Sequence, residues 1–296
     1  MVLEFPAAAR HAALGQAAAR DALQAGHLGE IAELHASRGE LGAAESLFRR
    51  AAEILCAIGG DRLEAAQACN RLAFFHRDMG WDGEAARFFR KAWDLAREVL
   101  ADDDPSCAVL LCNLAGACRE LGDLEAAESF YSQALEVFVA ALGEDHPESA
   151  RTRGELAALH RDRGDLTTAL LWARRALEEM RHGSGEPQQD LPAALVRLAG
   201  LYCDTSDFAA ARSLLLEADS LLRRQHGDTD AEILESALRL AEVSFAMGDY
   251  AEAERLFRLV LGLEGDAAKP DRDRLEICRH RLGLLVRHRG DSGGEA

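Results

Sequence analysis

The chain has 296 residues, 48% of them hydrophobic and 6% aromatic, so it can bury a core and lies outside the range of disordered chains. Its formal net charge of −17 repels phosphate backbones, which argues against general nucleic-acid binding. No run of 18 apolar residues occurs, and the N-terminus lacks the basic start and long apolar run of a secretory signal. We therefore expect a cytoplasmic protein that binds neither nucleic acid nor a membrane.

A turn glycine recurs along the chain, first after 41 residues and then every 42, with serine in its place once. We call these seven positions the anchors. A leucine or isoleucine stands eight residues before every anchor, and an alanine stands five residues after each of the first six. Such self-similarity predicts stacked helical hairpins, each of which buries its apolar face against the next. The anchors are Gly39, Gly80, Gly122, Gly164, Ser206, Gly248 and Gly290.

Each anchor has a physical role in this interpretation. Glycine permits the left-handed backbone that ends the first helix of a hairpin, and the acid that follows most anchors favours the start of the second helix. The small residues mark where the two helices approach most closely, because a larger side chain there would push them apart.

The elements follow in chain order. A helix over 6–22 is expected to cover the first hairpin, and Pro105 and Pro147 each begin a first helix after a capping residue. We predict a capping segment over 1–23, a single repeat domain over 24–290 and a disordered tail over 291–296. The hairpins are expected over 24–58, 63–101, 105–143, 147–182, 190–225 and 231–264, followed by a closing helix over 272–289.

The L-A…G-D…A-E…A-L pattern resembles tetratricopeptide repeats (TPRs). The period of 42 and the linker at 142–147, Leu-Gly-Glu-Asp-His-Pro, are similar to the kinesin-light-chain subtype, although the linker is degenerate elsewhere. The paired asparagine of that subtype is split here between Asn70 and Asn113. The resemblance covers about 24–290 and implies an all-α, right-handed superhelical solenoid of about six hairpins with N-terminal and C-terminal capping helices.

In that family the first helices of the hairpins line a concave groove that holds peptides. The resemblance therefore implies partner-binding residues nine and three residues before the anchors. Nine residues before stand Arg71, Asn113, Arg197, Arg239 and Arg281, to which we add Asn70. Three residues before stand Arg77, Arg119 and Arg161.

Arg197, Arg239 and Arg281 fall in consecutive repeats, and we call them the arginine stripe. Guanidinium groups suit bidentate contact with carboxylates, so the stripe would hold an acidic segment or a C-terminal carboxylate of a partner. The alternative is pairing with carboxylates of this chain, and both interpretations stay open. For Arg77 and its equivalents, which each precede an acid, internal pairing is favoured.

No residue pattern indicates catalysis, a metal or a cofactor. His35, His76 and His160 stand four residues before their anchors, a packing position, and equivalent positions in a solenoid do not converge on one ion. The cysteines form no CxxC pair, and most are expected as buried side chains in a reducing compartment. They are Cys56, Cys69, Cys107, Cys112, Cys118, Cys203 and Cys278.

The leading hypothesis is a non-enzymatic scaffold that binds a peptide or protein. An alternative is an adaptor or sensor subunit that controls a separately encoded effector such as a protease or NTPase, or a regulator that responds to a peptide pheromone. We also expect a homodimer through 272–289, because the last helix lacks a partner to cover its apolar face.

Overall fold

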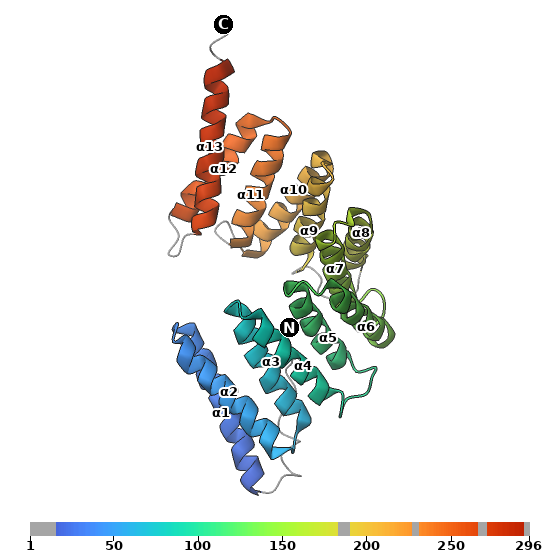
Figure 1. Ribbon diagram of the computed structural model, residues 1–296. Coiled ribbons are helices and arrows are strands. Elements are labelled where there is room, and N and C mark those ends of the chain that lie inside the picture. The colour runs from blue at the N-terminus through green and yellow to red at the C-terminus, as the bar shows by residue number, and fades with distance from the viewer. Residues whose placement is uncertain (1–15, 183–189, 227–230, 266–270, 293–296) are drawn as a thin grey trace. The chain divides into compact units, whose positions relative to one another are not determined.

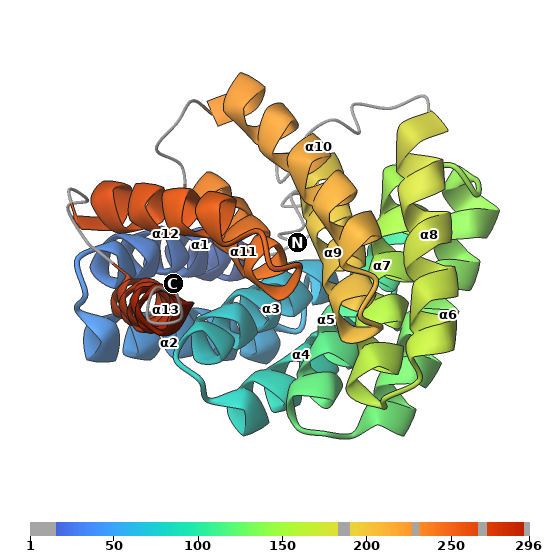
Figure 2. The same cartoon turned by 90° about the horizontal axis from the view of Figure 1, so that it is seen from above.

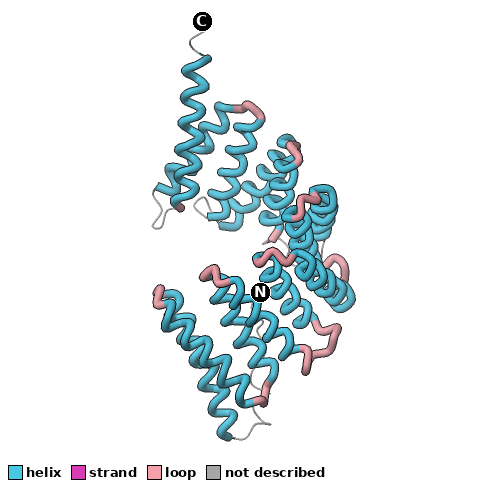
Figure 3. The backbone as a smooth tube through the Cα atoms, in the orientation of Figure 1, coloured by secondary structure: helices cyan, strands magenta, loops and turns pink. Residues whose placement is uncertain are grey.

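The computed structural model describes residues 16–182, 190–226, 231–265 and 271–292, and in these ranges it contains thirteen helices and no strand (Figures 1 and 3). The backbone contacts divide the chain into two compact units, Met1–Glu144 and Asp145–Ala296. Each unit is a row of antiparallel helical hairpins, so the all-α repeat fold expected from the sequence is confirmed.

The first unit holds three hairpins. Within each, the two helices pack along their length, and the second helix also contacts the first helix of the next hairpin (Figure 2). The helices are α1 (Gln16–Ser37) with α2 (Leu41–Ile58), α3 (Arg62–Asp78) with α4 (Asp82–Ala96), and α5 (Pro105–Glu120) with α6 (Leu124–Leu142).

The second unit holds three further hairpins and a final helix that packs on the last of them. The helices are α7 (Pro147–Asp162) with α8 (Leu166–His182), α9 (Leu191–Asp204) with α10 (Phe208–His226), α11 (Ala231–Ala246) with α12 (Tyr250–Gly265), and α13 (Arg272–Ser292).

The anchors end the first helices as the sequence predicts. The first four anchor glycines and Gly248 have φ between 72° and 79°, and Ser206 reaches 61°, the single positive φ of a non-glycine among the described residues. At Gly122 the amide donates to the Arg119 carbonyl, and the next amide, of Asp123, donates to the Cys118 carbonyl at 2.9 Å. This pair of bonds satisfies carbonyl groups that the helix end would leave open.

The core follows the repeat. The alanine five residues after each anchor is 0–1% exposed in all six hairpins. Large apolar residues nine residues after the anchors, such as Phe89, Tyr131 and Phe257, are also buried and fill the space between neighbouring hairpins. The small and large positions therefore have the roles inferred from the sequence.

Both ends differ from the expected boundaries. The prediction of a separate capping helix that stops before residue 24 is wrong. Instead α1 runs unbroken from Gln16 to Ser37 as the first helix of the first hairpin. Nothing in that stretch breaks a helix: Gly26 and Gly29 are tolerated singly within it. At the other end α13 continues through Gly290 to Ser292. Residues 1–15 and 293–296 lie outside the described part.

Among the described residues, no helix combines the length and the apolar composition needed to cross a membrane.

Candidate partner-binding site

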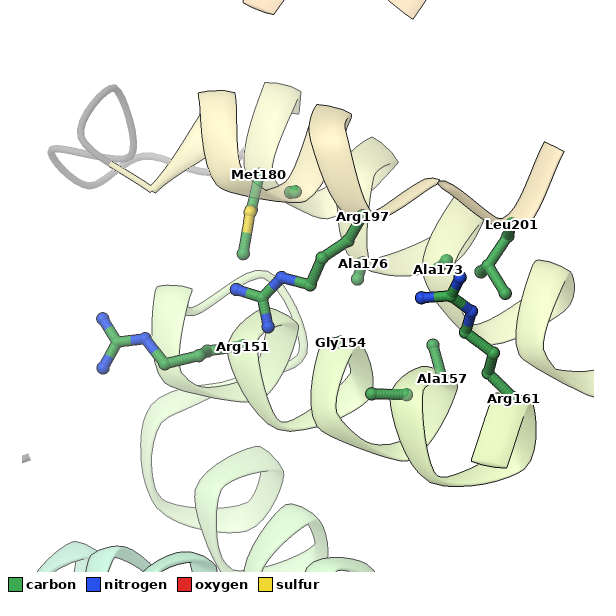
Figure 4. A pocket seen from close by; sticks show the side chains of 11 residues that line it. Arg151, Gly154, Ala157, Arg161, Ala173, Ala176, Met180, Arg197 and Leu201 are labelled. Atoms are coloured by element: carbon green, nitrogen blue, oxygen red, sulfur yellow. The ribbon is translucent and has the colours of Figure 1, made fainter. Parts of the chain in front are cut away.

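The second unit has a small hollow where α7, α8 and α9 meet (Figure 4). Its volume is about 50 Å³. Three arginines, Arg151, Arg161 and Arg197, stand around it, and alanines together with Met180 and Leu201 form its walls. The hollow is therefore apolar inside and cationic at its border.

A second, wider hollow of about 360 Å³ adjoins the first, and Arg161 lines both. Arg239 and Arg281 line it, and its apolar wall includes Leu238 and Val243. The repeat places residues of α7, α9, α11 and α13 at equivalent positions, so their side chains gather on one face of the unit. The arginine stripe and Arg161 thus border two adjoining hollows.

Each arginine of the stripe already contacts a carboxylate of this chain. Arg197 Nη1 lies 2.9 Å from Glu155, and Arg239 Nε lies 2.9 Å from Glu235 in its own helix. Arg281 on α13 holds Glu242 of α11 through two hydrogen bonds of 2.8 and 2.6 Å. The internal pairing that the sequence left as an alternative is therefore present.

The other two arginines of the hollows are also paired. Arg161 donates two hydrogen bonds to Asp204, of 2.5 and 3.1 Å, and this carboxylate raises the pKa of Arg161 further. Arg151 contacts Asp190 at 2.6 Å and Glu148 at 3.1 Å. Carboxylates thus neutralise the cationic border, and an incoming anion has to compete with them.

In the first unit, the two predicted asparagines meet. The Asn113 amide on α5 donates a 3.0 Å hydrogen bond to the Asn70 side-chain oxygen on α3, and Asn70 is 1% exposed. Asn70 therefore joins two hairpins, and its side chain is buried, so it is not available to a partner. The contact joins α3 and α5, the first helices of two consecutive hairpins. It can form because the two asparagines of the pair stand in different repeats.

In the first unit, the two predicted arginines that stand three residues before an anchor each contact the acid that follows them. Arg77 contacts Asp78 at 3.5 Å and covers the Phe74 ring at 4.6 Å, while Arg119 lies 3.8 Å from Glu120. These contacts follow the internal pairing that we favoured for this row. Arg161 differs, because it pairs with Asp204 of the next hairpin.

Two of the predicted arginines lie against glycines of the preceding hairpin. A Cβ atom added at Gly29 would lie 3.4 Å from Nη1 of Arg71, and one at Gly154 would lie 3.7 Å from Nη1 of Arg197. Both glycines stand ten residues before their anchor, and both arginines stand nine before the next one. This relationship was not predicted, although the sequence carries its signal: a glycine followed 42 or 43 residues later by arginine.

Arg153 and Glu179, which were not predicted from the sequence, form a buried ion pair between α7 and α8. Arg153 on α7 is 2% exposed and donates to the carboxylate of Glu179 on α8, which accepts a second hydrogen bond of 2.9 Å from Arg175. This pair fixes α7 against α8, the two helices that carry Gly154 and Met180.

The regularly spaced histidines pack against their own turns. His76 is fully buried among aromatic rings, while His35 and His160 contact the acid that follows their anchor glycine. Within the described ranges, no group of three or more His, Cys, Asp or Glu side chains is arranged to hold a metal ion.

A tetratricopeptide-repeat family model matches residues 64–138, 106–180 and 190–264, which together make up more than half of the chain. No curated protein matches.

Among solved structures, BtubC (BKLC) from P. vanneervenii is 24% identical, with a TM-score of 0.59 over 71% of this chain and 90% of that one. Nearly identical TPR-like repeats assigned to a kinesin light chain of Podosopora anserina are 20% identical, with a TM-score of 0.57 over 67% of this chain and 94% of that one.

The apo form of the quorum sensor NprR from B. thuringiensis is 15% identical, with a TM-score of 0.63 over 91% of this chain and 68% of that one. At these identities the likeness concerns the fold. The chain therefore belongs to the tetratricopeptide-repeat family.

Proposed function

We propose that this protein is a non-catalytic scaffold or regulator that binds a segment of a partner protein against the first helices of its second unit. The observation that carries the proposal is the pair of adjoining hollows, which combine an apolar interior with five arginines at the border. Concave sites with apolar walls and a few polar groups are the usual form of binding sites.

The first hollow supports a specific ligand chemistry. Its volume of about 50 Å³ has room for about four water-sized groups, which is the size of a branched aliphatic side chain. Arg151 and Arg197 stand at its edge, within reach of a carboxylate next to that side chain. We therefore propose a partner segment in which an aliphatic residue adjoins an acidic side chain or the C-terminal carboxylate.

Two of the three ion pairs of the arginine stripe are exposed enough to exchange. Arg197 and Glu155 are 41% and 31% exposed, and Arg239 and Glu235 are 43% and 39% exposed. Exposed pairs of this kind contribute about 0–1 kcal/mol. A partner carboxylate can therefore replace the internal one at little cost, while the apolar contact supplies most of the affinity.

The test measures binding of C-terminally varied peptides, each with a free and an amidated carboxyl group, to the wild type and to the Arg197→Ala/Arg239→Ala/Arg281→Ala variant. Tight binding by the free form alone identifies a C-terminal carboxylate, and equal binding of acidic peptides in both forms identifies an acidic segment. Either should weaken at least tenfold in the triple variant.

A matched control removes three arginines of second helices, Arg212, Arg223 and Arg255, which also contact carboxylates but line neither hollow. This control should bind as the wild type does. Equal binding by both triple variants would contradict the proposed site.

A second candidate is an adaptor or sensor that controls a separately encoded effector. The fold likeness to the quorum sensor NprR over 91% of this chain supports it. In that case a short signalling peptide would occupy the same hollows and change the association with the effector. Co-purification of an effector enzyme, lost or gained when the peptide is added, distinguishes this role from that of a passive scaffold.

Three further expectations belong to this proposal: a cytoplasmic location, a single repeat domain over 24–290, and a homodimer through 272–289. On α13 the side chain of Val286 is 65% exposed. Sedimentation of the wild type beside Val286→Glu tests the dimer, which the substitution should dissociate. A single unfolding transition of the whole chain would support one domain.

A further inference from the structure

The first helix of the first unit, α1, leaves exposed the side chains that later first helices bury. Leu34 of α1 stands five residues before its anchor and is 57% exposed, and Ile31, eight residues before it, is 42% exposed. The residues that stand five before the other six anchors are only 0–7% exposed. They are Phe75, Ala117, Leu159, Leu201, Val243 and Leu285. The repeat therefore builds at this position a buried contact that α1 does not make.

The equivalent contact in the next hairpin shows what kind of element fits this face. Phe75 on α3 packs its ring against that of Phe48 on α2, the second helix of the preceding hairpin, with centroids 5.6 Å apart. In each unit, the second helix of one hairpin contacts the first helix of the next. No second helix precedes α1 among the described residues, which begin at Gln16 (Figure 1). The face of α1 thus has the form of a surface that receives a second helix.

The exposed side chains of this face follow one another along α1 at spacings of four and three, so they project from one side of the helix. An arginine stands at each end of the row, and the apolar side chains lie between them. The structure gives neither arginine an ion pair with another described residue. An exposed apolar patch with a polar rim is typical of an interaction site. The row consists of Arg20, Gln24, His27, Ile31, Leu34 and Arg38, all of them exposed.

Elsewhere in the chain, acids of second helices contact basic side chains of the following first helix. Glu264 of α12 lies 2.7 Å from Arg274 of α13, and Glu45 of α2 lies 3.5 Å from His76 of α3. A helix that packs on α1 can pair its acids with the two arginines of the row in the same manner. Such exposed pairs set orientation more than affinity, which the apolar contact supplies.

We propose that this face of α1 binds an acidic amphipathic helix of a partner protein, which packs on the first unit as the second helix of an additional hairpin. Helices that place an apolar side against a complementary surface are a common mode of recognition. The partner helix carries apolar side chains against Ile31 and Leu34 and acids near both ends. It needs about five turns, or about 27 Å, to span the distance from Arg20 to Arg38. The site is separate from the two hollows, which belong to the second unit.

A second copy of this chain fits the face less well than such a helix does. Each of the six described second helices is already packed against the first helix of its own hairpin, so a second copy has no unpaired second helix to contribute. In an antiparallel pair of α1 helices that sets His27 against Ile31, the same register sets Arg20 against Arg38 of the other copy. Like charges then meet at both ends of the contact.

The probe for the test is a labelled peptide with the sequence of residues 123–145, which covers α6 and carries six acids and no basic residue. Fluorescence anisotropy with the full chain should show binding in the micromolar range. Ile31→Asp/Leu34→Asp should bind roughly tenfold more weakly and keep the circular dichroism of the wild type, because both side chains are exposed. The matched control Leu171→Asp/Leu216→Asp changes side chains of second helices that are 62% and 50% exposed, and it should bind as the wild type does. Equal binding by the two variants, or no binding by the wild type, would overturn the proposal.

A charge reversal tests the two ends of the row. Arg20→Glu/Arg38→Glu should weaken binding of the acidic peptide. A peptide in which lysines replace the four acids nearest its ends should bind this variant more tightly than it binds the wild type. The triple alanine variant of the arginine stripe should bind the acidic peptide as the wild type does, because its substitutions lie in the second unit. Loss of binding in the triple variant alone would place the peptide in the hollows and refute the α1 site.

Two other occupants of the face would give different results. If a second copy covers it, the wild type should sediment as a dimer and Leu34→Asp as a monomer. If residues 1–15 cover it, the peptide should bind the full chain only after Phe5→Ser/Leu14→Ser. Either result would contradict a partner helix on α1.

Discussion

The guanidinium of Arg197 donates a 2.9 Å hydrogen bond to Glu155, which occupies the same repeat position one hairpin earlier, 42 residues before it. An arginine predicted to meet a partner is thus neutralised by the preceding repeat. The period that gathers arginines on one face of the unit also brings carboxylates to that face, so the hollows present both the cation and its competitor.

This competition predicts opposite effects of two substitutions on the binding of an acidic partner segment. Glu155→Gln frees Arg197 and should tighten binding by up to about fivefold, the equivalent of the 1 kcal/mol that such a pair contributes at most. Arg197→Ala should weaken it. Isothermal titration with one peptide measures both, and Glu252→Gln, which frees Arg255 on α12 outside the hollows, is the control. A weaker complex with Glu155→Gln would contradict the exchange.

Ser206 predicts an increase in stability on substitution by glycine. Its φ of 61° places a non-glycine residue in the left-handed region, which costs about 1 kcal/mol or more. Ser206→Gly should therefore stabilise the fold by up to about 1 kcal/mol, part of the gain being lost to the greater freedom of glycine in the unfolded chain. Urea denaturation measures the change. Gly122→Ala, at an anchor with φ of 79°, should destabilise the protein by a similar amount.

The buried pair of Arg153 and Glu179 predicts a strong coupling between two substitutions. Arg153→Met alone leaves the Glu179 carboxylate without its main partner and should cost about 3–5 kcal/mol. The double variant Arg153→Met/Glu179→Leu should recover most of that loss, because both charges are then absent from the interior. Chemical denaturation of the two single variants and the double variant measures the coupling, and additive losses would refute it.

His76 predicts that stability decreases in mild acid. Burial lowers its pKa, the main effect, although Glu45 of α2 at 3.5 Å partly opposes it; Arg49 of α2 and Glu84 of α4 are the other charges that face the ring. The unfolded chain then binds a proton more readily than the folded one. The contribution of neutral His76 is therefore complete above the unfolded pKa of about 6.5 and is lost as the pH falls through the lower folded value.

Thermal unfolding between pH 7.5 and 5 measures this effect. His76→Leu should flatten the pH dependence over that range while keeping the apolar contacts with Phe75, Trp81 and Phe88. His160→Leu is a suitable comparison, since its ring lies 3.8 Å from Asp165 and is partly exposed. An unchanged slope in His76→Leu would show that other groups control the acid response.

The sequence by itself determined the hairpins and their turns. Only glycine adopts a positive φ at little cost, and only small side chains fit where two helices touch. Residues such as Gly122 and Ala127 therefore predict the turn and the close helix contact of each repeat. The periodic pattern also put Arg197, Arg239 and Arg281 on one face. These are local or periodic constraints, and one sequence expresses them completely.

The tertiary structure decided what each long side chain contacts. An arginine side chain can reach several neighbours from one backbone position. The repeat period therefore did not predict that Arg161 pairs with Asp204 of the next hairpin, whereas Arg77 pairs with the adjacent Asp78. Partner choice of this kind depends on distances across helices, which no repeat period encodes.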